Sequence, residues 1–217
     1  DAADHQLLLN FHGATLPRGW HRTYPNLMTV EAIKGQEFIT FEQVNADLQP
    51  AHCAVIPFTR NVYDPMDFTP MVLDSIPNIR RRTTTAFELA LPILFTSGVQ
   101  HIAEIPEGMR KMPQPVVELL KSIPTQWDES RFLEGYPGKF ICLARRKGDT
   151  WYIVGINGET SDRTFDLDLS FTGNAAGTLF FDGDSDLPAN RRLEMGPVQI
   201  AVQPHGGFLI KSAHSDK

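Results

Sequence analysis

Cysteine is scarce in this chain of 217 residues, which contains only Cys53 and Cys142. The two lie far apart and form no CxxC pair, so neither a zinc site nor a redox-active dithiol is indicated. Buried free thiols are the simplest interpretation, and a disulfide between them stays open. Long apolar runs are also missing. None approaches the roughly 20 residues that a transmembrane helix needs, so the sequence predicts no membrane insertion.

Basic residues are fewer than acidic residues. Lys and Arg total 20 against 26 Asp and Glu, which gives a net charge of −6. This balance argues against a nucleic-acid partner, because nucleic acids are bound by a clustered basic face. Arg80, Arg81 and Arg82 form a short basic cluster, and a solvated surface is its simplest interpretation.

The motifs of several enzyme classes do not occur. There is no GxSxG, Walker loop, GxGxxG or HExxH, so serine-nucleophile, phosphate-loop, dinucleotide and zinc-protease chemistry lack support. The segment FDGDSD (181–186) resembles half of a Ca²⁺ loop. It lacks the closing Glu and the flanking helices of an EF-hand, so we interpret it as a turn.

In residues 1–134, short apolar segments alternate with helical patterns. Strands are predicted at 6–13, 27–33, 52–59 and 99–103. Helices are predicted over 83–95, where Thr85 and Glu88 form a capping-box pattern, and over 115–123. Polar residues follow the strands, as at the active-site face of a (β/α)₈ barrel. We therefore expect 1–134 to be the C-terminal portion of a TIM-barrel catalytic domain, with about three of its eight strands.

After about residue 135 the pattern changes to short strands separated by turns. The apolar runs that predict these strands are 140–144, 151–154, 165–171 and 208–210. Gly148-Asp149 lies between the first two runs and predicts a β-hairpin. We expect 135–217 to be a small antiparallel β-sandwich domain without a helix, so that the whole chain is α/β plus all-β.

Two carboxylates mark the second predicted strand. Glu31 lies in the apolar run TVEAI, and Glu37 follows six residues later, after Gly35. A carboxylate in a buried strand is costly unless it is paired or binds a cation. Two acids so placed could divide a cation-binding role and an acid/base role. An ion pair of Glu31 with Arg22 or Arg60 stays open on these residues alone.

The histidines and the other acids give weaker signals. His12 ends the first predicted strand, just before Gly13, and could either contact a substrate hydroxyl or be structural. His52 and His101 are interpreted as structural. The loop acids, for which solvation is the simplest interpretation, are Asp64, Asp67 and Asp74.

Four segments together resemble glycoside hydrolase family 97. They are NFHGATLPRGWHRTYPNLMTVEAIKGQE (10–37), PFTRNVYDPMDFTP (57–70), IPTQWDESRFLEGYPGKFICLARRKGDTWYIVGINGET (123–160) and GGFLI (206–210). Their order and spacing extend the resemblance over nearly the whole chain. It implies an N-terminal β-sandwich, a central (β/α)₈ barrel and a C-terminal β-domain, with Ca²⁺ close to the catalytic carboxylates.

The resemblance also implies roles for single residues. Glu37 corresponds to the general acid/base, Glu31 to a calcium ligand and His12 to a residue that contacts the substrate. Gly13 stands where inverting α-glucosidase-type members carry a Glu base. Retaining members have a small residue there and use an Asp on an earlier strand as nucleophile. The resemblance therefore implies a retaining α-galactosidase acting on an α-galactoside or another α-linked oligosaccharide.

That nucleophile would precede residue 1. Because the chain opens with Asp1 rather than Met, almost directly before the apolar run 7–9, we expect a fragment, inactive alone, that packs against the remainder of the enzyme. Family habit further implies export to the bacterial periplasm or secretion. Two alternatives stay open: an inverting α-glucosidase of the same family, and a non-catalytic carbohydrate-binding protein.

Overall fold

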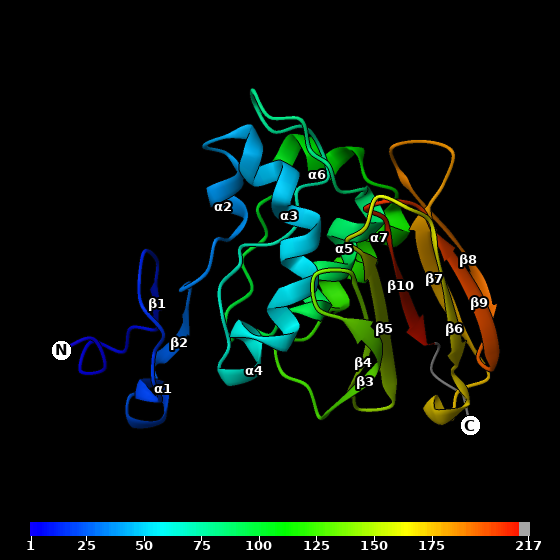
Figure 1. The fold of residues 1–217 in the computed structure, drawn as a ribbon. Helices are drawn as coiled ribbons and strands as arrows, with labels where there is room; N and C mark the ends of the chain where they lie inside the picture. Colours follow the sequence, from blue (N-terminus) through cyan, green and yellow to red (C-terminus); the bar gives the residue numbers. More distant parts are fainter. Residues whose placement is uncertain (213–217) are drawn as a thin grey trace.

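The computed structural model describes residues 1–212 and shows three layers. Helices from the first part of the chain cover one face of a six-stranded antiparallel sheet, and a two-stranded sheet covers the other face (Figure 1). The N-terminal strands lie at the far left of this view, on the other side of the helices from the large sheet (Figure 1). None of the described helices combines the length and apolar character that a bilayer crossing requires.

The two sheets form the C-terminal β-sandwich that the sequence predicts. In order across the large sheet, the strands are β3 (Glu129–Tyr136), β4 (Phe140–Lys147), β5 (Thr150–Asn157), β10 (Gly207–Ser212), β7 (Ala176–Asp182) and β8 (Pro188–Glu194). The small sheet pairs β6 (Arg163–Asp168) with β9 (Pro197–Val202). The predicted hairpin is confirmed, since Lys147 of β4 lies opposite Thr150 of β5. The large sheet begins at Glu129, so β3 crosses the expected boundary at 134/135.

Alternation along the strands divides the large sheet into two apolar faces, as the period of two of a β-strand requires. Trp151 and Ile153 of β5 pack in a cluster with Phe165 and Ile200 of the small sheet. Tyr152 and the residues that share its face pack against the helices instead. Both cysteines are buried and free, which confirms that interpretation. The run predicted to be a strand through residue 171 ends at Asp168, and a 3₁₀ turn η2 (Ser170–Thr172) follows.

The first part of the chain contains mainly helices. In chain order its elements are β1 (Leu9–Phe11), α1 (Trp20–Thr23), β2 (Leu27–Val30), α2 (Gln36–Ile39), α3 (Gln43–Val55), η1 (Ile56–Phe58), α4 (Arg60–Tyr63), α5 (Thr85–Leu94), α6 (Pro106–Lys111) and α7 (Gln114–Ser122). The helices predicted over 83–95 and 115–123 are confirmed as α5 and α7. Strands β1 and β2 pair in parallel, and Val30 makes one further parallel bridge to Met66. Parallel pairing is the arrangement expected in a barrel, but the barrel itself stays a prediction.

Three local predictions are wrong. Residues 52–59 belong to α3 and η1, because Ala46, Gln49, Pro50 and Cys53 are buried at helical spacing. A short apolar run does not separate a strand from a buried helix, which explains the error. Residues 99–103 lack strand pairing in the described structure. The N-cap of α5 is Thr84 rather than Thr85, and its hydroxyl accepts from the Phe87 amide.

The central helix α5 is capped at both ends by the β-sandwich. At its N-terminus, Asp182 Oδ1 accepts from the Ala86 amide at 2.9 Å and Oδ2 accepts from the Thr84 hydroxyl at 2.6 Å. At its C-terminus, Arg145 donates to the carbonyls of Ile93 (2.7 Å) and Leu94 (3.0 Å), and burial lowers its pKa to about 10. The segment 181–186 therefore contributes a helix cap, which agrees with its interpretation as a turn.

Candidate active site

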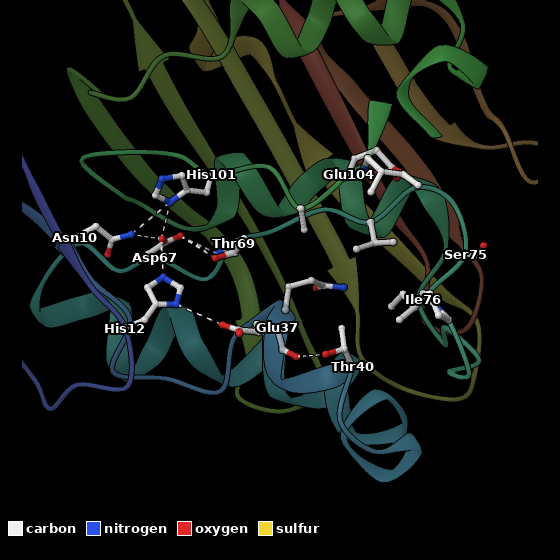
Figure 2. Close-up of a pocket in the computed structure, with 15 residues that line it drawn as sticks. Asn10, His12, Glu37, Thr40, Asp67, Thr69, Ser75, Ile76, His101 and Glu104 are labelled. Carbon is white, nitrogen blue, oxygen red and sulfur yellow. Dashed lines mark hydrogen bonds and ion pairs between the residues drawn. The ribbon is translucent and has the colours of Figure 1, made fainter. Parts of the chain in front are cut away.

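A pocket of about 600 Å³ lies where β1, the start of α2 and two long loops converge. The loops are residues 67–77 and 101–105, which are separated in sequence by α5. Figure 2 shows Asn10, His12, Glu37, Asp67 and His101 grouped at one end of the pocket, with Ile76 at the other. His12, Asp67 and His101 thus gather away from Ile76, while Glu104 and Ser75 line the pocket on the side of Ile76 (Figure 2).

Asp67 is the centre of this polar group. Its side chain is only 1% exposed, and its Oδ2 accepts from His12 Nε2 (2.8 Å), His101 Nδ1 (2.6 Å) and Asn10 Nδ2 (2.5 Å). Burial alone would raise the pKa of Asp67, but the hydrogen bonds from these three donors lower it below its ordinary value. The interpretation of Asp67 as a solvated loop acid is therefore wrong. His101, expected to be structural, lines the pocket beside it.

The other Asp67 oxygen holds its own loop in an unusual conformation. Oδ1 accepts from both the amide (3.0 Å) and the hydroxyl (3.2 Å) of Thr69. Thr69 has φ +52° and Met71 has φ +77°, on either side of Pro70. A positive φ is rare for a β-branched residue and persists only where the surroundings impose it. Asp67 therefore fixes the loop as well as the histidines.

His12 links Asp67 to the two predicted carboxylates. Its Nε2 donates to Asp67, and its Nδ1 lies 3.6 Å from an oxygen of Glu31 and 3.6 Å from an oxygen of Glu37. Burial lowers the pKa of His12, but the hydrogen bond to Asp67 and the charge of Glu31 outweigh this and raise it above its ordinary value. The structure thus brings together all three residues that the sequence analysis selected.

Glu31 interacts with this cluster rather than with an arginine. One carboxylate oxygen accepts from the Gly13 amide at 2.7 Å, and the other faces His12. Arg60 donates instead to the backbone carbonyls of Val30 and Glu31, and among the described residues no ion pair joins Glu31 to an arginine. The ion-pair alternative is therefore wrong.

Glu37 stands on the short helix α2, with its side chain 61% exposed at the pocket. The helix begins against the Asp67 loop, because the Gln36 amide donates to the Phe68 carbonyl at 2.8 Å. Gly35 permits this approach, since a Cβ there would lie 2.7 Å from the same carbonyl oxygen. One short segment, 67–68, therefore positions both His12 and the helix that carries Glu37.

A metal ion could be held by part of this cluster. Oxygens of Glu31 and Glu37 and the free nitrogen of His12 all lie within 4.8 Å of one another. Ca²⁺ prefers six to eight oxygen ligands, and the Glu31 oxygen that faces His12 suits such an ion. The two carboxylates could supply some of the oxygen ligands of such an ion. Water, substrate or other residues would have to supply the rest.

Two buried amide atoms of the pocket have no hydrogen-bond partner in residues 1–212. They are Asn10 Oδ1 and Gln36 Nε2. Sequence reasoning missed Asp67, His101, Asn10 and Gln36 as site residues. Asp67 lies within the segment 57–70 that carried the family resemblance, and that was the one available signal, but no role was attached to it.

Comparisons with known proteins show which family the sequence matches. The family model described as "Glycoside hydrolase 97" matches residues 1–33, and the one described as "Glycosyl-hydrolase 97 C-terminal, oligomerisation" matches residues 126–212. The chain is 36% identical over 215 residues to a protein of Streptomyces bingchenggensis named "Probable retaining alpha-galactosidase", covering 98% of this chain and 32% of the relative. It is 32% identical over 228 residues to a "Retaining alpha-galactosidase" of Bacteroides thetaiotaomicron, covering 96% and 34%.

Two solved structures are similar to this chain over nearly its whole length. A crystal structure of a β-arabinopyranosidase superposes with a TM-score of 0.91 at 36% identity, over 97% of this chain and 35% of that one. A family 97 enzyme from Pseudoalteromonas sp. strain K8, solved with panose, superposes with a TM-score of 0.82 at 28% identity, again over 97% and 35%.

The fold, the clustered carboxylates and these matches together identify the sequence as that of a glycoside hydrolase. Both matching family models describe one family, and the chain belongs to glycoside hydrolase family 97. It spans about a third of the length of the curated relatives that it matches.

Proposed function

We propose that this chain carries the acid/base part of the active site of a calcium-dependent retaining α-galactosidase. The observation that carries the proposal is the position of His12, whose Nδ1 lies 3.6 Å from both Glu31 and Glu37 in a pocket. Glu37 is then the general acid/base, Glu31 the calcium ligand and His12 the residue that contacts the sugar. The two relatives named as retaining α-galactosidases support this choice of activity.

In the proposed reaction, Glu37 protonates the leaving-group oxygen and then removes a proton from the water that releases the sugar. Its exposure on α2 leaves its carboxylate accessible to substrate. Asp67 is unsuited as a nucleophile, because it is buried and already accepts five hydrogen bonds. We place the nucleophilic Asp on an earlier barrel strand, in the part of the enzyme that precedes the matched third.

Glu31 is the proposed calcium ligand. When bound, the ion would supply positive charge that orients a substrate hydroxyl. Glu31 is suited to hold it, since the Gly13 amide fixes one carboxylate oxygen and leaves the other facing the cluster. His12 binds the sugar beside it, in the orientation that Asp67 imposes.

The remainder of the barrel is proposed to pack on β1. Within residues 1–212, β1 pairs with β2 and no other strand. Leu7, Leu8 and Phe11, in and just before β1, are exposed. An open strand edge beside exposed apolar side chains is a surface that a further strand would cover. Location in the periplasm or outside the cell stays a prediction from the family resemblance.

A β-arabinopyranosidase is the second candidate activity, because one of the similar structures carries that name. A β-L-arabinopyranoside has the ring configuration of an α-D-galactoside without its hydroxymethyl group, so one pocket could accept either. An inverting α-glucosidase is disfavoured, since Gly13 offers no carboxylate at the position of the base.

The test is hydrolysis by the complete protein of the 4-nitrophenyl α-D-galactoside, β-L-arabinopyranoside and α-D-glucoside, with and without EDTA. Release of α-galactose, followed by NMR and lost on chelation, is the expected result. Preferred release of β-arabinose would favour the second candidate. Release of β-glucose would establish the inverting alternative, and sugar binding without turnover would favour a carbohydrate-binding protein.

A further inference from the structure

Gln36 lies at the base of the pocket, directly before Glu37 in the sequence. Its side chain is 1% exposed, and the residue lines the pocket. The amide oxygen accepts a hydrogen bond from Gln49 Nε2 at 2.9 Å. The amide nitrogen has no acceptor among residues 1–212. One end of this side chain is therefore anchored in the protein, and the other is an unpaired buried donor.

The direction of the Gln36 amide is set by a buried acid. Glu88 of α5 has no exposed surface and accepts from Gln49 Nε2 (3.2 Å), the Thr83 hydroxyl (2.5 Å) and the Val72 amide (3.1 Å). Burial raises the pKa of Glu88, and Arg81 and these three donors oppose that shift. In this structure Gln49 turns its NH₂ group toward the Glu88 carboxyl group. The same NH₂ group faces Gln36, which must then present its oxygen. The Gln36 NH₂ group is thereby left for the pocket.

Rotating the Gln36 amide by half a turn does not remove the unpaired donor. It would place the NH₂ groups of Gln36 and Gln49 against each other and leave the Gln36 oxygen without a donor. More than nine in ten buried polar groups in proteins have a partner, and an unpaired one costs about 1–3 kcal/mol. Gln49 Oε1 also lacks a partner among residues 1–212. Of the two amides, Gln36 is the one that lines this pocket, so a molecule in the pocket could supply the acceptor that Nε2 lacks.

We propose that Gln36 Nε2 donates a hydrogen bond to one hydroxyl group of the bound sugar and so determines which sugar the site accepts. This inference rests on the proposed glycosidase function and adds a specificity residue to it. A sugar hydroxyl is the fitting acceptor, because the donor is neutral and stands beside the acid that must reach the glycosidic oxygen. Glu88 and Gln49 are positioning residues that keep the donor turned toward the substrate.

The test combines variants of Gln36 with substrates that lack single hydroxyls. Values of kcat/KM are measured for the wild-type complete protein and for Gln36→Met on 4-nitrophenyl α-D-galactoside and its 2-, 3-, 4- and 6-deoxy analogues. Methionine keeps the length of the side chain but removes the donor. Gln199→Met is the matched control, since Gln199 lies on the exposed face of β9 and bonds to Asp166. Gln36→Ala serves as the second variant if Gln36→Met does not fold.

The expected result is a loss of about ten- to a hundredfold in kcat/KM on the parent substrate and on all analogues but one. On that one analogue the wild type and the variant agree within about twofold, because the hydroxyl that Gln36 would bind is already gone. An equal loss on every substrate, or no loss on any, would overturn the inference while leaving the function intact. Failure of the wild-type protein to turn over any of these substrates would overturn the proposed function and this inference with it.

Discussion

The imidazole of His12 donates through Nε2 to Oδ2 of Asp67 over 2.8 Å, and this bond determines where its second nitrogen points. That nitrogen lies 3.6 Å from both Glu31 and Glu37. An acid buried behind a histidine is a common way to fix the orientation of its ring. The predictions below follow from this relationship and from the supports around it.

Replacement of Asp67 by Asn should impair the site although Glu31 and Glu37 stay unchanged. The amide would lose part of the capacity to accept from His12, His101 and Thr69, so His12 would no longer be held. We expect kcat/KM on the α-galactoside to fall by about 10- to 100-fold. Asp74→Asn is the control, since Asp74 bonds to Lys111 at the surface. Wild-type kinetics in Asp67→Asn would contradict the role assigned to this residue.

The stability difference between the wild type and Asp67→Asn should depend on pH. The pKa of Asp67 is lowered in the folded state, so its contribution to stability is present above the unfolded value of about 3.9 and is lost as pH falls through the folded value. Because Asp67 also raises the pKa of His12, the difference in unfolding free energy between wild type and Asp67→Asn should grow as pH falls from about 8 to 6, stay constant to about pH 5 and shrink below about pH 4. Urea unfolding at several pH values measures it, and a difference that still grows on acidification below about pH 4 would contradict the account.

Gly35→Ala should move the helix that carries Glu37. The new methyl group would lie 2.7 Å from the Phe68 carbonyl oxygen, so the backbone must shift, at a cost of about 1–3 kcal/mol. Both the unfolding midpoint and kcat should fall. Gly196→Ala is the control, because a Cβ there meets nothing within 4 Å. If the two variants behave alike, the close approach of residues 35 and 68 is not what positions α2.

The cap that the sandwich places on α5 should be measurable in stability. Asp182→Ala removes acceptors from the Ala86 amide and the Thr84 hydroxyl, and leaving such a part-buried donor unpaired costs about 1–3 kcal/mol. Asp184→Ala, in the same turn but exposed, is expected to change stability little. Thermal unfolding compares the two. Equal midpoints would show that Asp182 does not stabilise the helix.

The sequence predicted the parts of the fold that depend on local pattern. The continuous apolar run 151–154 predicted β5, and the apolar periodicity of 83–95 predicted α5, because both patterns indicate burial. The run 52–59 was misassigned, since a short apolar segment fits a strand or a helix equally well. Glu31, Glu37 and His12 were found from strand ends and from the family resemblance. Asp67 and Gln36 were not, because their importance comes from partners 55 and 13 residues away.

The account depends most on Glu37 as the general acid/base, and one comparison tests it directly. Glu37→Gln is measured in the complete protein on an α-galactoside with a poor leaving group, such as the methyl glycoside, and on one with a good leaving group. Glu42→Gln, exposed at the start of α3, is the control. We predict that kcat/KM on the poor leaving group falls by about 10²- to 10⁴-fold in Glu37→Gln, and far less on the good one, because only the former needs protonation. Wild-type turnover of the poor leaving group by Glu37→Gln would contradict the assignment.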